Sequence, residues 1–427
     1  MKKQLSMTVM GGMGVLLSSY VQAEFFKDSS SSLKLQNYYM DSDYRDEKIA
    51  LRPQQSKKEE WAQGATFKFN SGFTEGGVGV GVDVIAMLGV KLYSDPETSG
   101  TGLLAVSSAN IAGKPSYEHD AKDIYSKVGA AAKIKYEKNI LKYGALIPEG
   151  VPVLLPNDAR LFSQIFRGWD FQSTEIENLK LKAGWIDRVK QRNSVTFDDL
   201  TIDTTRYKQN QTSDHFSYVG FDYQFNPNLI GTYYFSQLKD SYNQHYLGLK
   251  ATQKLGAGKF TTDLRYFNSS DSGEALAGKI NNQMYTFSLN YKLNSHYFNA
   301  GYQKIDGGQA LPYLNGAGPY TPTLSMVSYF TLANESTWWV KYSYDFSSLG
   351  LSGLSFSNKY LRGENAKVSN STKEQKEWEW DKELAYTVQS GRLKNLSLRL
   401  RHATFRSTLD RGIDQTRVIL AYTFHLK

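Results

Sequence analysis

Three arginines near the C-terminal end of the chain have the chemistry to bind an anion together. Arg399 and Arg401 are separated by a single leucine, and Arg417 follows in the next patterned segment. A guanidinium keeps its proton at physiological pH, and its planar fork of N–H groups matches a carboxylate through two parallel hydrogen bonds. Guanidinium groups that converge also repel one another, so an anionic partner stabilises them. These residue types therefore predict a carboxylate-binding site.

The segments that carry the arginines alternate between apolar and polar side chains. Successive side chains of a β-strand point to opposite faces, so a strand through this region places the arginines on one face and the leucines on the other. The apolar face of these two segments is formed by Leu396, Leu398 and Leu400, and by Val418, Leu420, Tyr422, Phe424 and Leu426. The opposite face of the last segment carries Arg417, Ile419, Ala421 and Thr423.

The longest alternating segment runs over residues 77–92. Every second residue from Val78 to Leu92 is apolar, whereas the other face carries several glycines, Asp83 and Lys91. A strand in a soluble sandwich is usually about half as long. Alternation over this length is typical of a strand with one face in lipid and the other in a water-filled lumen. The pattern recurs over residues 285–293 and 338–345.

Composition supports a membrane barrel rather than a bundle of helices. The 427 residues include 29 Tyr and 22 Phe, and yet the mean hydropathy is −0.48. After the N-terminus there is no run of about 20 apolar residues that could form a transmembrane helix. The absence of cysteine excludes disulfides, thiolate metal sites and thiol catalysis. We predict an all-β fold, a transmembrane antiparallel β-barrel of roughly 16 to 18 strands.

The N-terminus has the order of features found in a secretory signal. Lys2 and Lys3 precede an apolar stretch from about Leu5 to Leu17, and Val21-Gln22-Ala23 ends the segment. This order favours export over the alternative of a buried N-terminal helix. We predict a signal peptide at residues 1–23 and a barrel domain at residues 24–427.

Polar connections of two sizes separate the predicted strands. Short ones include residues 226–228 and 348–353. The long ones are predicted at residues 95–123, 147–167, 187–214, 306–336 and 363–381. Short turns at one end and long loops at the other are typical of outer-membrane barrels.

The inward face of the predicted strands carries more basic than acidic side chains. A charge on the lipid face at mid-membrane costs about 2 to 4 kcal/mol, so basic residues at that depth must point inward. The predicted basic lining consists of Lys68, Lys133, Lys135, Lys180, Lys182, Arg265, Lys292, Lys341, Lys359, Arg399, Arg401 and Arg417. Fewer acids share this face, chiefly Asp83, Glu137, Asp222, Asp263 and Asp345. We expect an anion preference; the alternative is that these cations and acids neutralise one another as ion pairs.

At this point the chain resembles the OprD-type, or carboxylate-selective, outer-membrane porins. The resemblance covers nearly the whole mature chain, and the order and spacing of several stretches carry it. These stretches are Asp28-Ser29-Ser30, Asn37-Tyr38-Tyr39, Trp61-Ala62-Gln63-Gly64, Ser71-Gly72-Phe73-Thr74-Glu75-Gly76, Gly79-Val80-Gly81-Val82-Asp83, Leu141-Lys142-Tyr143-Gly144, Ala159-Arg160-Leu161-Phe162, Val388-Gln389-Ser390-Gly391 and Leu398-Arg399-Leu400-Arg401.

The resemblance implies an 18-stranded barrel, a monomer or loose trimer, whose third extracellular loop folds inward to narrow the pore. It implies a ladder of basic residues to which Arg399, Arg401 and Arg417 belong, and it makes Arg160 the arginine of the constriction loop. Two positions depart from the family pattern. Gln36 stands where relatives often have Arg, and no acid occurs between Asp306 and Glu335, where relatives that take basic amino acids have one. Neutral or aromatic carboxylates are therefore the expected substrates.

Other constellations carry less weight. Residues 273–279 have the G-x-x-x-x-G-K skeleton of a phosphate loop, but Ile280 replaces the required Ser or Thr. The six His never occur at metal-ligand spacing. The acidic run Glu374, Glu377, Glu379, Asp381 and Glu383 is interpreted as a solvated strand top, with divalent cations among lipopolysaccharide phosphates as the alternative.

We therefore predict a porin in the outer membrane of a Gram-negative bacterium, with small carboxylate-bearing solutes as substrates and with membrane lipid and lipopolysaccharide around it. The resemblance implies that carbapenems, which carry a carboxylate, are candidate solutes as well. We expect no enzymatic activity, no cofactor, no metal site and no nucleic-acid partner. A non-selective diffusion porin is the nearest alternative. A barrel hydrolase is a more distant one, because no Ser, His and Asp or Asn are predicted to meet on one face.

Overall fold

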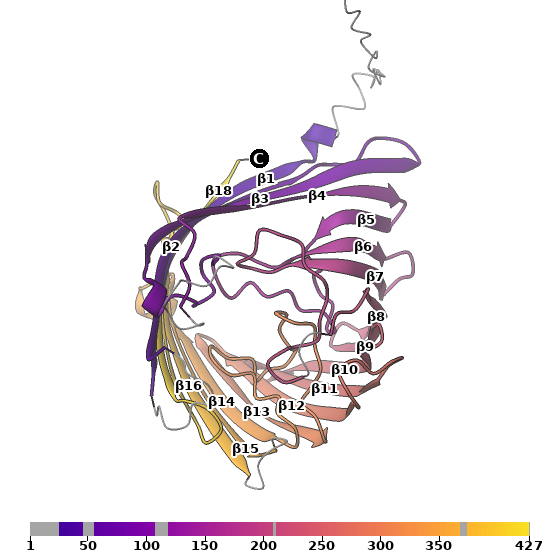
Figure 1. Cartoon of the computed structure of the whole chain (residues 1–427). Coiled ribbons are helices and arrows are strands. Elements are labelled where there is room, and N and C mark those ends of the chain that lie inside the picture. The colour runs from indigo at the N-terminus through magenta and orange to yellow at the C-terminus, as the bar shows by residue number, and fades with distance from the viewer. Residues whose placement is uncertain (1–24, 46–54, 107–117, 208–210, 368–373, 427) are drawn as a thin grey trace, which may run out of the picture.

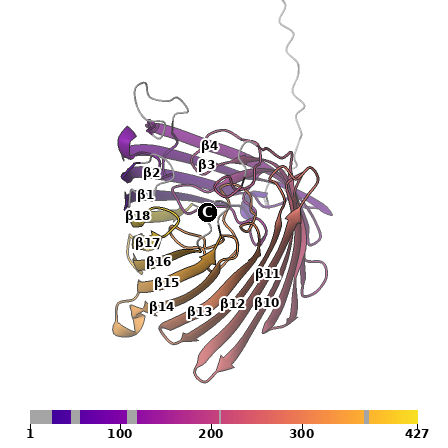
Figure 2. The ribbon, with the colours of Figure 1, turned by 60° about the horizontal axis from the view of Figure 1, so that its bottom comes forward.

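The computed structural model describes residues 25–45, 55–106, 118–207, 211–367 and 374–426. The predicted signal peptide, residues 1–23, lies outside the described residues. None of the helices in these ranges has both the length and the apolar character needed to cross a membrane. The dominant element is the β-strand, and Figures 1 and 2 show the strands arranged around a central space into which loops fold.

Eighteen strands and two short 3-10 helices are the main regular elements of these ranges, and residues 25–27 form a helical turn before the first strand. The strands are β1 (Ser30–Tyr44), β2 (Lys57–Asn70), β3 (Val78–Ser94), β4 (Ile124–Tyr136), β5 (Asn139–Leu146), β6 (Ile165–Ser173), β7 (Leu179–Lys190), β8 (Phe216–Asn226), β9 (Leu229–Leu238), β10 (Tyr242–Leu255), β11 (Gly258–Asp271), β12 (Asn281–Leu293), β13 (His296–Gly307), β14 (Ser336–Asp345), β15 (Leu354–Ala366), β16 (Gln375–Thr387), β17 (Ser397–Ser407) and β18 (Ile413–His425). The helices are η2 (Pro96–Thr98) and η3 (Phe346–Leu349).

The strands form one closed antiparallel barrel. Each strand pairs with the next in sequence, and β18 pairs with β1 along the register Ser32↔His425 to Tyr44↔Ile413. Closure leaves no sheet edge, so the backbone groups of every strand are paired within the barrel. The predicted fold class, a transmembrane antiparallel barrel of 18 strands, is confirmed.

The predicted alternation also holds along the strands. In β3, Val78 and Val80 are 56% and 48% exposed on the outer face, whereas Ile85 and Met87 are buried against the lumen. In β17, Leu398 and Leu400 are exposed on the outside. The apolar outer face matches lipid, because only every second side chain of a strand has to be lipophilic.

Connections differ in length between the two ends of the barrel. Within the described ranges, no connection at the end where both termini lie exceeds nine residues, whereas much longer ones occur among the connections at the other end. We number the latter L1 to L9 in chain order; the four longest are L2 (95–123), L3 (147–164), L4 (191–215) and L7 (308–335). The predicted connections at 95–123 and 306–336 agree with L2 and L7 to within two residues.

One predicted loop is wrong for a physical reason. Residues 363–381 were expected to be a connection, but β15 continues to Ala366 and β16 begins at Gln375. The acids of β16 occupy alternate positions, and Trp378 and Trp380 occupy the others, which is the strand period. These acids face inward, and Glu377 and Glu379 are buried. The interpretation of this run as a solvated strand top is therefore wrong.

Loops L3, L4 and L7 fill much of the lumen and pack against the inner face. Leu311 and Leu314 of L7 join Leu200 and Ile202 of L4 in a cluster with buried strand residues such as Phe216. An isolated bridge, Ile202↔Leu314, connects the two loops directly, and another, Leu155↔Gly318, connects L3 with L7. The barrel therefore has an internal core made by loops, and these loops position the groups that line the pore.

Candidate pore constriction

A cavity of about 870 Å³ lies between the inward-folded loops and one wall of the barrel. L3, L4 and L7 form one side of it, and β14 to β18 form the other. The lining residues include all four arginines singled out from the sequence, Arg160, Arg399, Arg401 and Arg417. The volume is that of a small-solute site.

Two of these arginines share one carboxylate. Arg399 donates from Nε and Nη2 to the two oxygens of Glu383, at 3.3 and 2.6 Å. The Nε of Arg401 lies 2.8 Å from Glu383 Oε2. The side chains of Arg399 and Arg401 are 44% and 25% exposed, so part of each guanidinium still faces the lumen. One acid therefore partly balances two cations.

Arg417 lies beside Arg401, because the two are direct partners in the β17–β18 ladder. Its side chain is 1% exposed. Its Nε donates to Gln415 at 2.7 Å, and its Nη2 donates to the carbonyl of Met326 in L7 at 2.6 Å. Arg417 thus lines the cavity but has donors already engaged with protein groups.

Arg160 reaches the cavity from L3. Its Nε donates to the carbonyl of Thr101 in L2, and its Nη1 donates to the carbonyl of Ala159, both at 3.0 Å. Tyr38 of β1 donates to the same Ala159 carbonyl at 3.3 Å, which holds L3 against the wall. Burial, and then the neighbouring Arg192, lower the pKa of Arg160 to about 10. It therefore stays cationic at neutral pH.

Residues outside the predicted set complete the cavity. Arg192 and Arg206 enter from L4, and Tyr313 and Tyr329 enter from L7. The acids Asp158, Asp203, Asp381 and Glu383 come from L3, L4 and β16. L7 contributes no acid to the lining of the cavity, and Glu335, at its end, is the first acid of its sequence. Loop arginines could not be placed in advance, because no strand period fixes where a loop side chain points.

Lys34 is a wall cation that the predicted lining omitted. It lies in β1 on the same face as Gln36, and it interacts electrostatically with Arg399 and Asp158. The sequence already indicated that Lys34 faces inward, because it alternates with the apolar Leu33 and Leu35. The side chain of Gln36, where a basic residue was expected by resemblance, is buried in the wall.

Two other predicted lumen cations, Lys133 and Arg265, are neutralised locally. Lys133 and Lys142 both contact Asp83, at 2.7 and 2.6 Å. Arg265 forms a two-point pair with Asp263, at 3.0 and 2.7 Å. For these residues the ion-pair alternative applies.

Comparison with known proteins agrees with this architecture. A family model for outer membrane porins of the OprD family matches residues 23–426. The chain belongs to the OprD family. Within this family of porins, GalP, a porin-like protein of Pseudomonas putida, is 33% identical over 407 residues, which cover 94% of this chain and 93% of GalP. Porin D of Pseudomonas aeruginosa is 32% identical over 91% of this chain and 88% of its own length.

Solved OprD-family structures show the same barrel. Pseudomonas aeruginosa OccK9 (OpdG) matches with a TM-score of 0.88 and 36% identity, over 94% of this chain and all of that one. Pseudomonas aeruginosa OpdK, solved with vanillate, matches with a TM-score of 0.86 and 36% identity over the same shares. The family and its relatives are outer-membrane porins and not enzymes, so the porin, its outer-membrane location and the family suggested by the sequence are confirmed. The connections L1 to L9 are then the extracellular ones.

Proposed function

We propose that this OprD-family porin passes small carboxylate-bearing solutes, which bind transiently to Arg399, Arg401 and Arg160 at the constriction. Arg417 adds positive charge at the same depth. The partly exposed guanidinium groups of Arg399 and Arg401 replace the water that a carboxylate loses on entering the cavity. No covalent step is involved.

The observation that carries this proposal is the charge balance of the cavity. Among the described lining residues that reach it from inward strand positions or loops, eight are basic and four are acidic, a net excess of +4 (8 − 4). The eight are Arg160, Arg192, Arg206, Lys341, Lys359, Arg399, Arg401 and Arg417, and the four are Asp158, Asp203, Asp381 and Glu383. Charge confined in a narrow site with low-dielectric walls raises the local concentration of the opposite ion.

The shared carboxylate of Glu383 supports release as well as capture. A substrate carboxylate can take the place of Glu383 on one guanidinium while Glu383 keeps the other. Conduction requires binding that is strong enough for entry and weak enough for exit. An exchange between two carboxylates meets both requirements, because no arginine is left without a partner at any stage.

Aromatic carboxylates are the substrate class that the cavity favours. Tyr313 and Tyr329 of L7 line it together with the arginines, with ring centroids 6.1 Å apart. A benzoate-like solute can place its ring near these side chains and its carboxylate on the wall. The relative OpdK was solved with vanillate, an aromatic carboxylate. We therefore propose benzoate derivatives as the first solutes to test.

The test is single-channel recording of the purified porin in planar bilayers. A KCl gradient is expected to give a reversal potential that shows anion preference, and benzoate is expected to block the current more strongly than benzamide, its neutral isostere. Removing the guanidinium groups in an Arg399→Ala, Arg401→Ala double variant should lower the benzoate block by about tenfold or more, since each charge-assisted hydrogen bond contributes about 1.5 to 3 kcal/mol.

Arg362→Ala is the matched control. Arg362 is paired with Glu364 on the outer face of β15, so its loss removes the same group away from the lumen. Cation preference in the wild type, or equal block by benzoate and benzamide, would rule out the carboxylate mechanism and favour non-selective diffusion.

A further inference from the structure

L7 is held across the lumen by side chains of opposite charge from neighbouring strands. We define the L7 bridge as residues 322–328. Charged side chains of the wall contact its backbone and its Ser328 hydroxyl. We call four of them the L7 clamp: Lys359 (β15), Glu377 and Glu379 (β16), and Arg417 (β18). The clamp residues are close neighbours on the arginine-bearing wall.

The acidic half of the clamp binds donors of the bridge. Glu379 accepts the N–H of Val327 at 2.8 Å through one oxygen and the N–H of Ser328 at 2.7 Å through the other. Glu377 accepts the hydroxyl of Ser328 at 2.7 Å. The side chain of Glu379 has no exposed surface. A buried carboxylate with two backbone donors is a strong and directional attachment point.

The basic half binds acceptors of the same segment. The Nζ of Lys359 donates to the carbonyls of Pro322 and Leu324, at 2.8 and 3.1 Å, and to the hydroxyl of Ser325 at 3.0 Å. Arg417 donates to the carbonyl of Met326. The clamp carboxylates accept hydrogen bonds from N–H groups of the bridge, and the clamp cations donate to its carbonyls. This arrangement fixes the bridge in one register, because a shift by one residue would exchange N–H groups for carbonyls.

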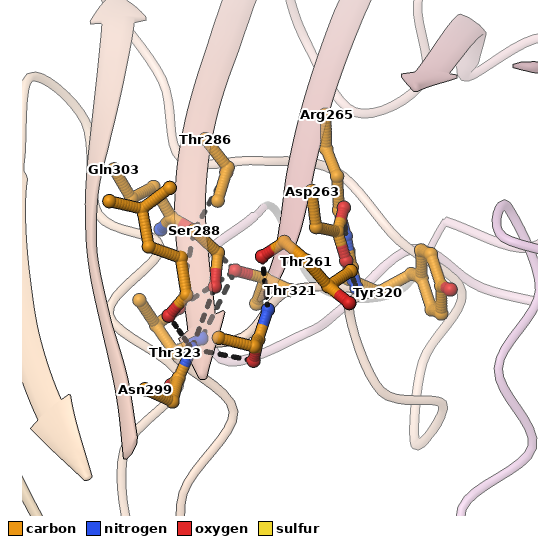
Figure 3. Close-up of polar contacts among 12 residues, drawn as sticks. Thr261, Asp263, Arg265, Thr286, Ser288, Asn299, Gln303, Tyr320, Thr321 and Thr323 are labelled. Carbon is orange, nitrogen blue, oxygen red and sulfur yellow. Dashed lines mark hydrogen bonds and ion pairs between the residues drawn. The ribbon is translucent and has the colours of Figure 1, made fainter. Parts of the chain in front are cut away.

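The preceding part of L7 is attached to strands further round the barrel, β11 and β13. Figure 3 shows Tyr320, Thr321 and Thr323 against Arg265 of β11 and Gln303 of β13. Arg265 lies 4.1 Å from the centre of the Tyr320 ring and donates to the Tyr320 carbonyl at 3.3 Å. Both threonine hydroxyls donate to Gln303. L7 is thus attached to the barrel just before the bridge as well as along it.

Backbone strain directly after the bridge is consistent with a loop that is forced into place. Phe330 has a φ of 54°, in the left-handed region that bulky side chains rarely adopt. Its side chain is fully buried with Trp339 and Leu361, and its carbonyl accepts from Gln303 at 2.8 Å. Such a conformation persists only where the surroundings determine it.

We propose that Glu379 and Arg417 are positioning residues, which set the bore and selectivity of the pore by holding the L7 bridge across the lumen. Arg417 acts mainly through the loop, whereas Arg401, its ladder partner, faces the solute. The inference rests on the proposed function only where benzoate block is measured. The expected change in pore width, measured as conductance, is independent of which solute passes.

The first experiment compares Glu379→Ala with Glu364→Ala, an exposed carboxylate on the outer face of β15. Losing both charge-assisted bonds of Glu379 is expected to raise the ratio of released to docked L7 by about two orders of magnitude, roughly one order for each bond. Single-channel records should then show a frequent higher-conductance level that the wild type and the control rarely visit. Heat-modifiable migration in gel electrophoresis checks that each barrel is folded.

A cross-link between L7 and β16 should restore the wild-type conductance, which it could not do in a variant that is unfolded. The chain has no cysteine, so Ser328→Cys with Glu379→Cys creates the only two thiols. With these thiols free, the double variant should resemble Glu379→Ala. A short bifunctional thiol reagent that joins L7 to β16 should restore the wild-type conductance level, and a reagent that reacts with single thiols should not.

The third comparison separates the two adjacent arginines. Arg417→Ala is expected to raise the higher-conductance occupancy at least tenfold, in line with one lost bond to L7. Arg401→Ala is expected to weaken benzoate block without that level. The proposal is overturned if Glu379→Ala keeps wild-type conductance, or if Arg417→Ala changes only anion preference as Arg401→Ala does. If the wild type shows no carboxylate preference but the Glu379→Ala pore is wider, the proposed function is rejected and the inference about the L7 clamp still holds.

Discussion

Glu383 accepts hydrogen bonds from the Arg399 donors that the proposed carboxylate substrates would use, so its neutralisation should tighten substrate binding. The Glu383→Gln substitution keeps the size of the side chain and an acceptor oxygen, but it removes the negative charge between Arg399 and Arg401. A residue that only stabilised the wall would weaken binding when changed. The sign of the effect is therefore the informative quantity.

The magnitude follows from Coulomb's law. A substrate carboxylate bound on the far side of a guanidinium would lie about 8 Å from Glu383, and the side chain of Glu383 is 24% exposed, so an effective dielectric constant between 20 and 80 applies. The repulsion removed is then about 0.5 to 2 kcal/mol. This corresponds to an affinity gain of roughly 2- to 30-fold, because 1.4 kcal/mol is a factor of ten.

The assay is the concentration dependence of current block by benzoate and benzamide at about 0.1 M and about 1 M KCl, where the screening lengths are about 10 and 3 Å. Glu383→Gln should strengthen benzoate block at low salt, lose most of that gain at high salt and leave benzamide unchanged. Glu364→Gln, on the outer face, is the matched control. Weaker benzoate block in Glu383→Gln, or an equal change for benzamide, would refute the reasoning.

Three further predictions test the loop attachment, the packing and the wall. Burial, and then a neighbouring carboxylate, raise the pKa of Glu335 in L7 well above its usual value. Its contribution to docking L7 is therefore complete below the ordinary glutamate pKa and is lost as pH rises through the raised pKa, so current noise should increase with pH in the wild type and not in Glu335→Gln. In Gly301→Ala, the new Cβ would lie 2.1 Å from the ring of Trp339, and the resulting overpacking should destabilise the barrel by about 1 to 3 kcal/mol, measured as a lower temperature of the heat-modifiable transition. Lys34→Ala should weaken benzoate block several-fold when benzoate is added from the short-turn side, because Lys34 interacts with Arg399 along the wall; an unchanged block from that side would exclude Lys34 from the path.

The sequence alone determined the barrel and the direction of its strand side chains. A strand has a period of two, and lipid tolerates almost no charge, so alternation assigns each residue to a face without knowledge of its neighbours. This rule places Arg399, Arg401 and Arg417 inward, and it would have placed Lys34 inward as well. The family pattern added Arg160, which no period could have located.

Only the tertiary structure decided what these inward groups contact. Glu377 and Glu379 are an acidic run in the sequence, but L7 folds onto them from about 50 residues away in the chain. Arg417 has the same parity as Arg401, but a carbonyl of L7 takes one of its donors. Long-range loop docking depends on many weak contacts formed together, and no local pattern encodes it. The strand pattern therefore predicts which arginines face the lumen, while the division that we propose between binding and positioning residues depends on where L7 lies.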